Sequence, residues 1–292
     1  MISVRMLPAL LVGLVLGGAV TYALVSPRAL YSVAEPAEAP QKEDPPNRSL
    51  DANLYMQISA EYRASCYQTY HFAFVRLQEI IRTRKNDRQM AIVLDLDETV
   101  FDNGSYQTRM LQRGLAYSQK DWDAFEQKHG DQVRLVPGAK DFLVAADRLG
   151  IALVYISNRS EKYRDQTLAV IGRLGLPLPG TDRVKLAAEA TGSNKDSRRK
   201  EAYDAFDVVM LVGDNLRDFD DKPFRSAVDN TKPDGKTDDA ARLDGAIEAR
   251  FRAVDEMRTK FGTTWIILPN PAYGEWTKVL GNGAKDAERL RK

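Results

Sequence analysis

The stretch Ala-Ile-Val-Leu-Asp-Leu-Asp-Glu-Thr, residues 91–99, decides the fold class of this chain. Its first four residues form a short apolar run rich in β-branched side chains, which is typical of a strand buried on both faces of a sheet. The run stops at Asp95, and Asp97 follows two residues later. In an extended or tightly turned segment, side chains at i and i+2 can point to the same side. The stretch therefore predicts a buried strand whose end carries two carboxylates, although acidic residues there can also simply cap a helix or turn.

Three further apolar runs in the second half of the chain have the character of buried strands. They are residues 151–156 (Ile-Ala-Leu-Val-Tyr-Ile), 208–212 (Val-Val-Met-Leu-Val) and 264–268 (Thr-Trp-Ile-Ile-Leu). Residues 53–84, before the first strand, have the apolar spacing of one or two amphipathic helices. Strands that alternate with helices are typical of an α/β fold in which helices cover a parallel sheet.

Polar side chains follow two of these later runs, at the point where each predicted strand ends. Ser157, Asn158 and Arg159 come directly after one strand, and the segment 213–218 (Gly-Asp-Asn-Leu-Arg-Asp) follows the next. In open α/β sheets, ligands bind outside the carboxyl ends of the strands, so these clusters and the two aspartates after the first strand should converge on one crevice. Taken singly, each cluster is equally compatible with an ordinary turn or helix start.

The aspartates at these strand ends form a candidate metal site. Asp214 and Asp218 are four residues apart, so on a helical turn they share a face and can meet Asp95 and Asp97. Four carboxylates repel one another unless a cation neutralises them, and Mg²⁺ prefers oxygen ligands of this kind. The alternative is a solvated loop in which one aspartate caps a helix. A single cysteine and two histidines are too few for a zinc site of the Cys/His type.

The same crevice offers donors for a phosphoryl group. Ser157, Asn158 and Arg159 supply a hydroxyl, an amide and a guanidinium, which suit three acceptor oxygens. A further cation is needed to offset the charge of phosphate and carboxylates, and Lys195, in Asn-Lys-Asp-Ser, is the candidate. In such a site one carboxylate can bind the metal and attack phosphorus, while another exchanges a proton with the leaving oxygen and with water.

The N-terminal residues 1–25 read as a membrane anchor or a signal peptide. Residues 6–25 carry no charge, and a helix of this length is long enough to span a bilayer. Arg5 favours a cytoplasmic N-terminus and export of the body, although a cleaved signal peptide would also lead to export. We therefore expect an extracytoplasmic protein of the cell envelope, periplasmic or on the outer surface, anchored by this helix. Gly13 and Gly17 could pack two such helices into a homodimer.

The remaining chain divides into a linker and one globular domain. Residues 26–49 are rich in Pro, Ala and Glu and should form an extended tether, whereas residues 50–292 form the domain. Lys and Arg total 42 against 41 Asp and Glu, so the net charge is +1. A nearly neutral chain has no global positive field that would gather a nucleic-acid polymer, so no such partner is expected.

Two gapped signatures resemble those of a known family. Residues 95–100 (Asp-Leu-Asp-Glu-Thr-Val) with Asn103 and Tyr106, and residues 209–219 (Val-Met-Leu-Val-Gly-Asp-Asn-Leu-Arg-Asp-Phe), resemble the paired motifs of bacterial class C acid phosphatases. This is the DDDD-motif branch of the haloacid dehalogenase-like (HAD) superfamily, and the chain departs from it at Phe101, where leucine is usual. Further matches are Val136-Pro137-Gly138, Ser157-Asn158-Arg159, Lys195-Asp196-Ser197, Lys260-Phe261-Gly262, Leu268-Pro269-Asn270 and Tyr273-Gly274.

The resemblance implies a Rossmann-like α/β core with a small helical cap, whose elements would lie at about 50–86 and 103–135. It further implies Mg²⁺-dependent hydrolysis of small phosphomonoesters through an aspartyl-phosphate. Asp95 would be the nucleophile and a metal ligand, and Asp97 the general acid/base that also gives its backbone carbonyl to the metal. Asp214 and Asp218 would complete the metal site. Ser157 and Lys195 would hold the phosphoryl group, with Asn158 and Arg159 as further phosphate partners.

The resemblance also bears on the substrate. Tyr106 and Tyr273 match aromatic positions that hold the substrate, often a nucleoside monophosphate, although a tyrosine in such segments can equally be a packing residue. Thr108-Arg109 stands where relatives often have another aromatic, which weakens the case for a nucleotide. Phosphotransfer to an alcohol would use the same residues. A different class of function is a catalytically silent, membrane-tethered protein that binds phosphate ligands on this fold.

Overall fold

The computed structural model describes residues 48–85, 87–189, 192–229 and 239–279. They belong to a unit that extends from Asn47 to Lys292. The predicted membrane segment 1–25, and the predicted linker up to residue 47, lie outside the described residues. Among the residues that the structure does describe, no helix has both the length and the apolar character needed to cross a bilayer.

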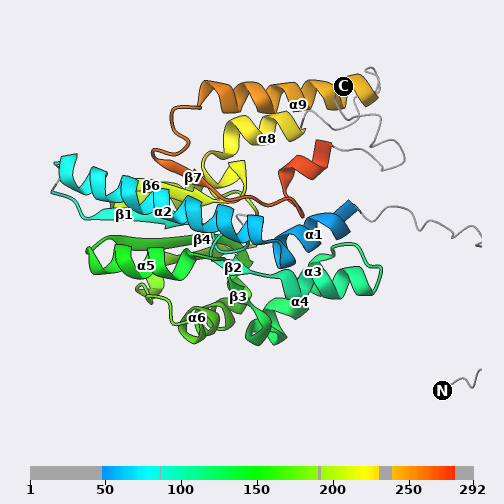
Figure 1. Cartoon of the computed structure of the whole chain (residues 1–292), viewed down its shortest axis with the longest axis horizontal. Helices are drawn as coiled ribbons and strands as arrows, with labels where there is room; N and C mark the ends of the chain where they lie inside the picture. Colours follow the sequence, from blue (N-terminus) through cyan, green and yellow to red (C-terminus); the bar gives the residue numbers. More distant parts are fainter. Residues whose placement is uncertain (1–47, 86, 190–191, 230–238, 280–292) are drawn as a thin grey trace, which may run out of the picture. The chain divides into compact units, whose positions relative to one another are not determined.

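A five-stranded parallel sheet in the order β5-β4-β1-β6-β7 forms the centre of the domain (Figure 1). Its strands are β1 (Met90–Leu94), β4 (Ala152–Ser160), β5 (Val184–Ala187), β6 (Asp207–Gly213) and β7 (Trp265–Ile267). In the central strand, Ile92 is aligned with Leu153 of β4 on one side and with Met210 of β6 on the other. Because every pair is parallel, the carboxyl ends of all five strands lie at the same edge of the sheet.

The alternation of side chains along β1 explains why this segment is apolar throughout. Ile92 and Leu94 pack into one core cluster, whereas Ala91 and Val93 pack into another on the opposite face of the sheet. All four side chains are buried, so a polar residue at any of these positions would lose its hydration. The sequence prediction of a strand covered on both faces is thus confirmed.

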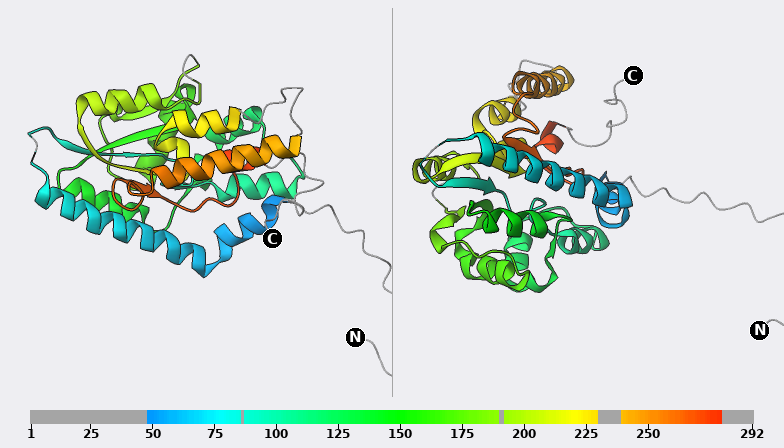
Figure 2. Two further views of the ribbon diagram at one scale, coloured as in Figure 1. Left: turned by 90° about the horizontal axis from the view of Figure 1, so that it is seen from above. Right: turned by 60° about the vertical axis from the view of Figure 1, so that its left-hand side comes forward.

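Helices cover both faces of the sheet (Figures 1 and 2). The first cluster includes buried side chains of α2 (Ala60–Thr83), α5 (Ala139–Arg148) and α6 (Arg164–Arg173), among other elements. The second includes residues of α7 (Asp196–Ala205), α8 (Asp221–Asp229) and α9 (Asp239–Glu256). Figure 1 shows α8 and α9 on one side of the sheet and α5 and α6 on the other. This arrangement is the helix-flanked parallel α/β fold that the sequence predicts.

Smaller elements follow β1 in the chain and group near α1 at one end of the sheet (Figure 1). They are α3 (Gly104–Gln112), α4 (Gln119–Lys128) and an antiparallel pair of short strands, β2 (Phe101–Asp102) and β3 (Arg134–Leu135). Helix α1 (Arg48–Ile58) contacts α3, and α4 contacts α6. The short 3₁₀ helices are η2 (Gly130–Gln132), η3 (Glu161–Tyr163), η4 (Thr181–Arg183), η5 (Leu216–Asp218) and η6 (Glu275–Val279). The division of the domain into core and cap elements stays a prediction.

The element boundaries agree with the sequence where the apolar pattern is continuous. The predicted strands at 91–94, 151–156, 208–212 and 264–268 correspond to β1, β4, β6 and β7. The predicted helical region 53–84 forms two helices, because Ser59 interrupts it and caps α2 by accepting a hydrogen bond from the Tyr62 N–H at 2.9 Å. Strand β5 was not predicted, because its four residues alternate between buried and half-buried positions and include Lys185.

Candidate active site

Three aspartates from two strand ends converge at the carboxyl edge of the sheet. Asp95 follows β1, and its N–H donates to the Val212 carbonyl of the neighbouring strand at 2.9 Å. Asp214 follows β6, and Asp218 closes the short helix η5. Carboxylate oxygens of all three residues lie within 4.8 Å of one another. The strand ends therefore bring together three of the four carboxylates that the sequence predicts as metal ligands.

The chain after β6 is shaped to place Asp218. The Asn215 N–H donates to Asp218 Oδ2 at 2.9 Å, which completes a reciprocal capping box at the start of η5. Gly213 is required here because a Cβ at this position would lie 2.5 Å from the Cβ of Asp218. The Gly-Asp-Asn-Leu-Arg-Asp motif is thus a compact turn that places both of its carboxylates, those of Asp214 and Asp218, near Asp95.

Lys195, at the start of α7, lies inside this cluster. Its Nζ donates to Asp95 and, at 2.6 Å, to Asp218 Oδ1. Burial lowers the pKa of Lys195, but the two carboxylates outweigh burial and hold the pKa above its ordinary value. The two carboxylates therefore favour the charged form of Lys195, which joins Asp95 to Asp218.

The cluster still has an excess of negative charge, because three carboxylates surround one ammonium. Burial, with Asp218 as the next cause, raises the pKa of Asp214 to about 7. Burial also raises the pKa of Asp95 well above its ordinary value, against the effect of Lys195. Three carboxylates with converging oxygens form a donor set that a hard divalent cation such as Mg²⁺ would neutralise.

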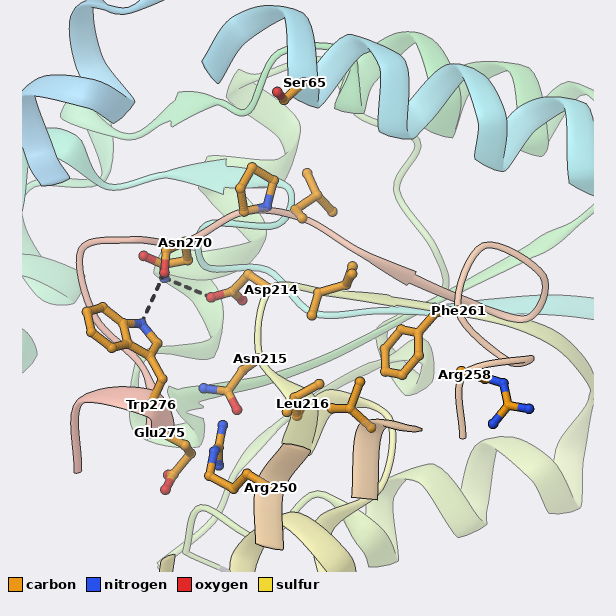
Figure 3. A pocket seen from close by; sticks show the side chains of 14 residues that line it. Ser65, Asp214, Asn215, Leu216, Arg250, Arg258, Phe261, Asn270, Glu275 and Trp276 are labelled. Atoms are coloured by element: carbon orange, nitrogen blue, oxygen red, sulfur yellow. Dashed lines mark hydrogen bonds between the residues drawn. The ribbon is translucent and has the colours of Figure 1, made fainter. Parts of the chain in front are cut away.

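Two neutral side chains orient Asp214 from either side. Thr99 Oγ1 donates to Asp214 Oδ1 at 3.2 Å, and Asn270 Nδ2 donates to Asp214 Oδ2 at 2.8 Å (Figure 3). Thr99 is itself held by Tyr70, whose hydroxyl donates to the Thr99 carbonyl at 2.6 Å. Such supporting donors fix the orientation of a metal-binding carboxylate.

Asp97 lies in a separate network of donors. Its Oδ1 accepts from Asn103 Nδ2 at 2.9 Å and from Arg159 Nε at 2.8 Å, and its Oδ2 accepts from Ser157 Oγ at 3.1 Å. Arg159 also donates to Asn103 Oδ1 at 2.9 Å. The carboxylate of Asp97 is thus held by three side chains, while the other three aspartates are grouped around Lys195.

The predicted phosphate donors occupy different positions. Arg159 is 1% exposed and lies between the rings of Phe101 and Trp122, at 5.0 and 5.4 Å from their centroids, with its guanidinium directed at Asp97. Asn158 is exposed, and its Oδ1 accepts from Arg198 Nη2 at 2.7 Å. Arg198 additionally donates to the Ser157 carbonyl and so supports the end of β4.

The two predicted substrate tyrosines have unlike surroundings. Tyr106 is 2% exposed and packs against Trp122 and Phe125, with ring centroids 5.0 and 5.3 Å away. Its hydroxyl has no hydrogen-bond partner among the described residues, and burial raises its pKa to about 12. Tyr273 is half-buried, and its N–H donates to Asn270 Oδ1 at 3.3 Å. Tyr273 therefore adjoins a side chain that contacts Asp214, whereas Tyr106 is part of an aromatic cluster.

The structure adds four side chains to which no role was assigned from the sequence: Thr99, Asn103, Arg198 and Asn270. Arg198 lies one helical turn after Lys195, a spacing that could have identified it. Asn270 follows the carboxyl end of β7, where ligand-binding residues are expected in an open sheet.

Comparison with known proteins agrees with this geometry. Residues 31–276 match the family model described as HAD superfamily, subfamily IIIB (acid phosphatase). The chain is similar to the class C acid phosphatase from Bacillus anthracis with tungstate bound, at 30% identity over 84% of this chain and 96% of that one, with a TM-score of 0.68. A second structure of the Bacillus anthracis enzyme matches at 32% identity over 82% of this chain and 92% of that one, with a TM-score of 0.66. The chain belongs to subfamily IIIB of the HAD superfamily, the class C acid phosphatases, and is a phosphomonoester hydrolase.

Proposed function

We propose that this phosphatase is Mg²⁺-dependent and hydrolyses organic phosphomonoesters through an aspartyl-phosphate on Asp95. The observation that carries the proposal is the cluster in which Lys195 bridges Asp95 and Asp218, with Asp214 within 4.8 Å. A buried carboxylate beside a fixed ammonium group and a cation site is suited to attack an anionic phosphoryl group, since the local positive charges offset the repulsion.

The residues fit a magnesium ion. Asp95, Asp214 and Asp218 would supply side-chain oxygens, and Asp97 would add its backbone carbonyl, as the family resemblance implies. When bound, the ion would neutralise the carboxylates and withdraw charge from the phosphoryl oxygens. The hydrogen bonds from Thr99 and Asn270 to the carboxylate of Asp214 support this role.

In the proposed reaction, an oxygen of Asp95 forms a bond to phosphorus as the bond to the leaving oxygen breaks. Asp97 in its protonated form gives its proton to that leaving oxygen and then takes a proton from the water that hydrolyses the aspartyl-phosphate. Ser157 and Lys195 hold the transferred group. The contacts of Arg159 with Asp97 and Asn103 favour a role in positioning Asp97 over a direct bond to phosphate.

The proposed substrate class is small organic phosphates, with nucleoside monophosphates as one candidate. Tyr273 supports an aromatic contact near the reaction centre, because its backbone binds the same asparagine that contacts Asp214. Tyr106 supports it less, since its ring is enclosed by Trp122 and Phe125. Export to the cell envelope, an anchor at residues 6–25 and a homodimer also stay proposals that rest on the sequence.

The test is an assay of the full chain with p-nitrophenyl phosphate, in Mg²⁺ and in EDTA. We expect turnover that EDTA abolishes and Mg²⁺ restores, and that falls at least about 1000-fold in Asp95→Asn, as is typical when a nucleophile is removed. Asp204→Asn is the matched control, because Asp204 is exposed on α7 and its carboxylate pairs with Lys200. Turnover that survives in Asp95→Asn, or that EDTA leaves unchanged, would contradict the proposal.

A further inference from the structure

A pocket of about 760 Å³ adjoins the proposed reaction centre on the side of β7 (Figure 3). It lies between α9 and the segment 268–276, and both Asp214 and Asn270 line it. Its volume falls in the range of about 300–1,000 Å³ that is typical of small-molecule sites. Because Asp214 lies within 4.8 Å of Asp95, this space adjoins the place where a substrate would bind.

Arg250 of α9 is the unusual residue of this pocket. Its side chain is 8% exposed, yet its Nη1 has no hydrogen-bond partner among the residues that the structure describes. Burial lowers the pKa of Arg250, against the opposing effect of Glu275. A buried guanidinium N–H that lacks a partner is costly, because the hydration that it loses is not replaced. Figure 3 shows the side chain at the pocket wall, directed toward Asn215.

Glu275, the acid that acts on Arg250, does not supply the missing hydrogen-bond partner. Glu275 Oε1 accepts from Arg217 Nη1 and from Lys278 Nζ, both at 2.8 Å, and no hydrogen bond joins it to Arg250 within the described structure. Arg217 in turn also donates to Asp221 at 2.6 Å. Glu275 is thus already engaged by Arg217 and Lys278, and Arg250 Nη1 keeps a donor for a ligand.

The rest of the lining suits a small polar ligand with an apolar part. Trp276 forms one wall, where its Nε1 donates to the carbonyls of Asn270 and Tyr273, each at 3.2 Å. Leu216 and Phe261 supply apolar surface, and Asn215 adds an amide (Figure 3). The pocket therefore combines buried Arg250 and exposed Arg258 with the carboxylates of Asp214 and Glu275, an amide and apolar walls.

We propose that this pocket is a subsite for a second anionic group, a carboxylate or a further phosphate, carried by the leaving group of the phosphomonoester. Arg250 binds that group through its guanidinium fork, which matches two acceptor oxygens. The group takes no part in the chemistry, so it selects substrates without changing the reaction. The inference rests on the proposed hydrolysis at Asp95 and adds the substrate class.

The experiment compares 3-phosphoglycerate with glycerol 3-phosphate, which differ by a carboxylate in place of a hydroxymethyl group. We expect the full-length enzyme to prefer 3-phosphoglycerate in kcat/KM by about 10- to 100-fold, the value of one charged hydrogen-bonding contact. Arg250→Met should abolish the preference, and Arg250→Lys should retain part of it. Arg252→Met, at an exposed position of the same helix, should leave both substrates unaffected.

A binding measurement separates this inference from the proposed function. In the Asp95→Asn background, calorimetry with Mg²⁺ should show that 3-phosphoglycerate binds more tightly than glycerol 3-phosphate, and that Arg250→Met removes the difference. Equal affinity of the two ligands, or a difference that survives in Arg250→Met, would overturn the subsite. A wild-type enzyme that hydrolyses neither these substrates nor p-nitrophenyl phosphate would instead overturn the proposed function, and the binding data would still decide on Arg250.

Discussion

Replacing Arg159 with methionine should impair proton transfer to the leaving group more than it impairs phosphoryl transfer itself. The guanidinium is 1% exposed and donates to Asp97 at 2.8 Å and to Asn103 at 2.9 Å. Methionine fills part of the space between Phe101 and Trp122 but donates nothing, so both acceptors lose a partner. Asp97 keeps its hydrogen bonds with Asn103 and Ser157, so its carboxylate is held less firmly but stays in the same place.

The magnitude follows from these contacts. Removing one partner of a fully buried ion pair costs about 3–5 kcal/mol of stability. The Asp97 side chain is 17% exposed, so Arg159→Met should cost less than that but still have a lower melting temperature. A general acid contributes about 10²- to 10⁴-fold to the rate, and a misplaced Asp97 should lose part of that factor, about 100-fold. The loss should depend on the leaving group, because an alkoxide needs a proton as it departs whereas p-nitrophenolate does not.

The assay therefore measures kcat for an alkyl phosphate and for p-nitrophenyl phosphate with wild type, Arg159→Met and Asp97→Asn. We expect the alkyl phosphate to lose about 100-fold in Arg159→Met, with a fall of about 10-fold or less for p-nitrophenyl phosphate. Asp97→Asn should show the same pattern with a larger loss. Arg148→Met, exposed on α5, is the control. Equal losses for both substrates would refute a role of Arg159 in positioning the acid and would favour a direct contact with phosphate.

Three other predictions concern the metal site, packing and pH. Asn270→Ala removes a donor to Asp214, so it should raise the Mg²⁺ concentration for half-maximal activity by about 10-fold; an unchanged value would contradict that role. Gly213→Ala forces a Cβ to 2.5 Å from Asp218 and should lower the free energy of unfolding by about 1–3 kcal/mol in urea titrations, whereas Gly245→Ala, which has open space, should not. Burial raises the pKa of Glu126 to about 7, so the folded state holds a proton that the unfolded state loses. The free energy of unfolding should therefore fall as pH rises from the ordinary glutamate range to about 7, and Glu126→Gln should flatten that dependence. An equally steep fall in Glu126→Gln would contradict this explanation.

The sheet was predictable because its strands are buried on both faces. Such strands must be apolar at every position, so β1, β4 and β6 stand out as continuous runs, and their polar ends mark the edge where ligands bind. Strand β5 lacks that signal because two of its four residues are only half-buried. The meeting of Asp95 with Asp214 was equally predictable, since it follows from two adjacent parallel strands.

The separation of Asp97 from the other aspartates was not predictable. It depends on Arg159, whose guanidinium reaches a residue 62 positions earlier in the chain, and on the Asn103 side chain that joins both. Spacing along the sequence shows which residues follow a strand but not which donor each side chain selects. The same reason explains Tyr106, whose match to a substrate position does not show that Trp122 and Phe125 enclose its ring.

The most direct test of the account is to detect the covalent intermediate. Wild-type enzyme that is turning over p-nitrophenyl phosphate with Mg²⁺ would be quenched in acid, digested and analysed by mass spectrometry. The account predicts a phosphoryl group on the peptide that contains Asp95, localised to that carboxylate and absent from Asp95→Asn. A phosphoryl group on another residue, or an unmodified peptide under conditions where product forms in a pre-steady-state burst, would contradict it.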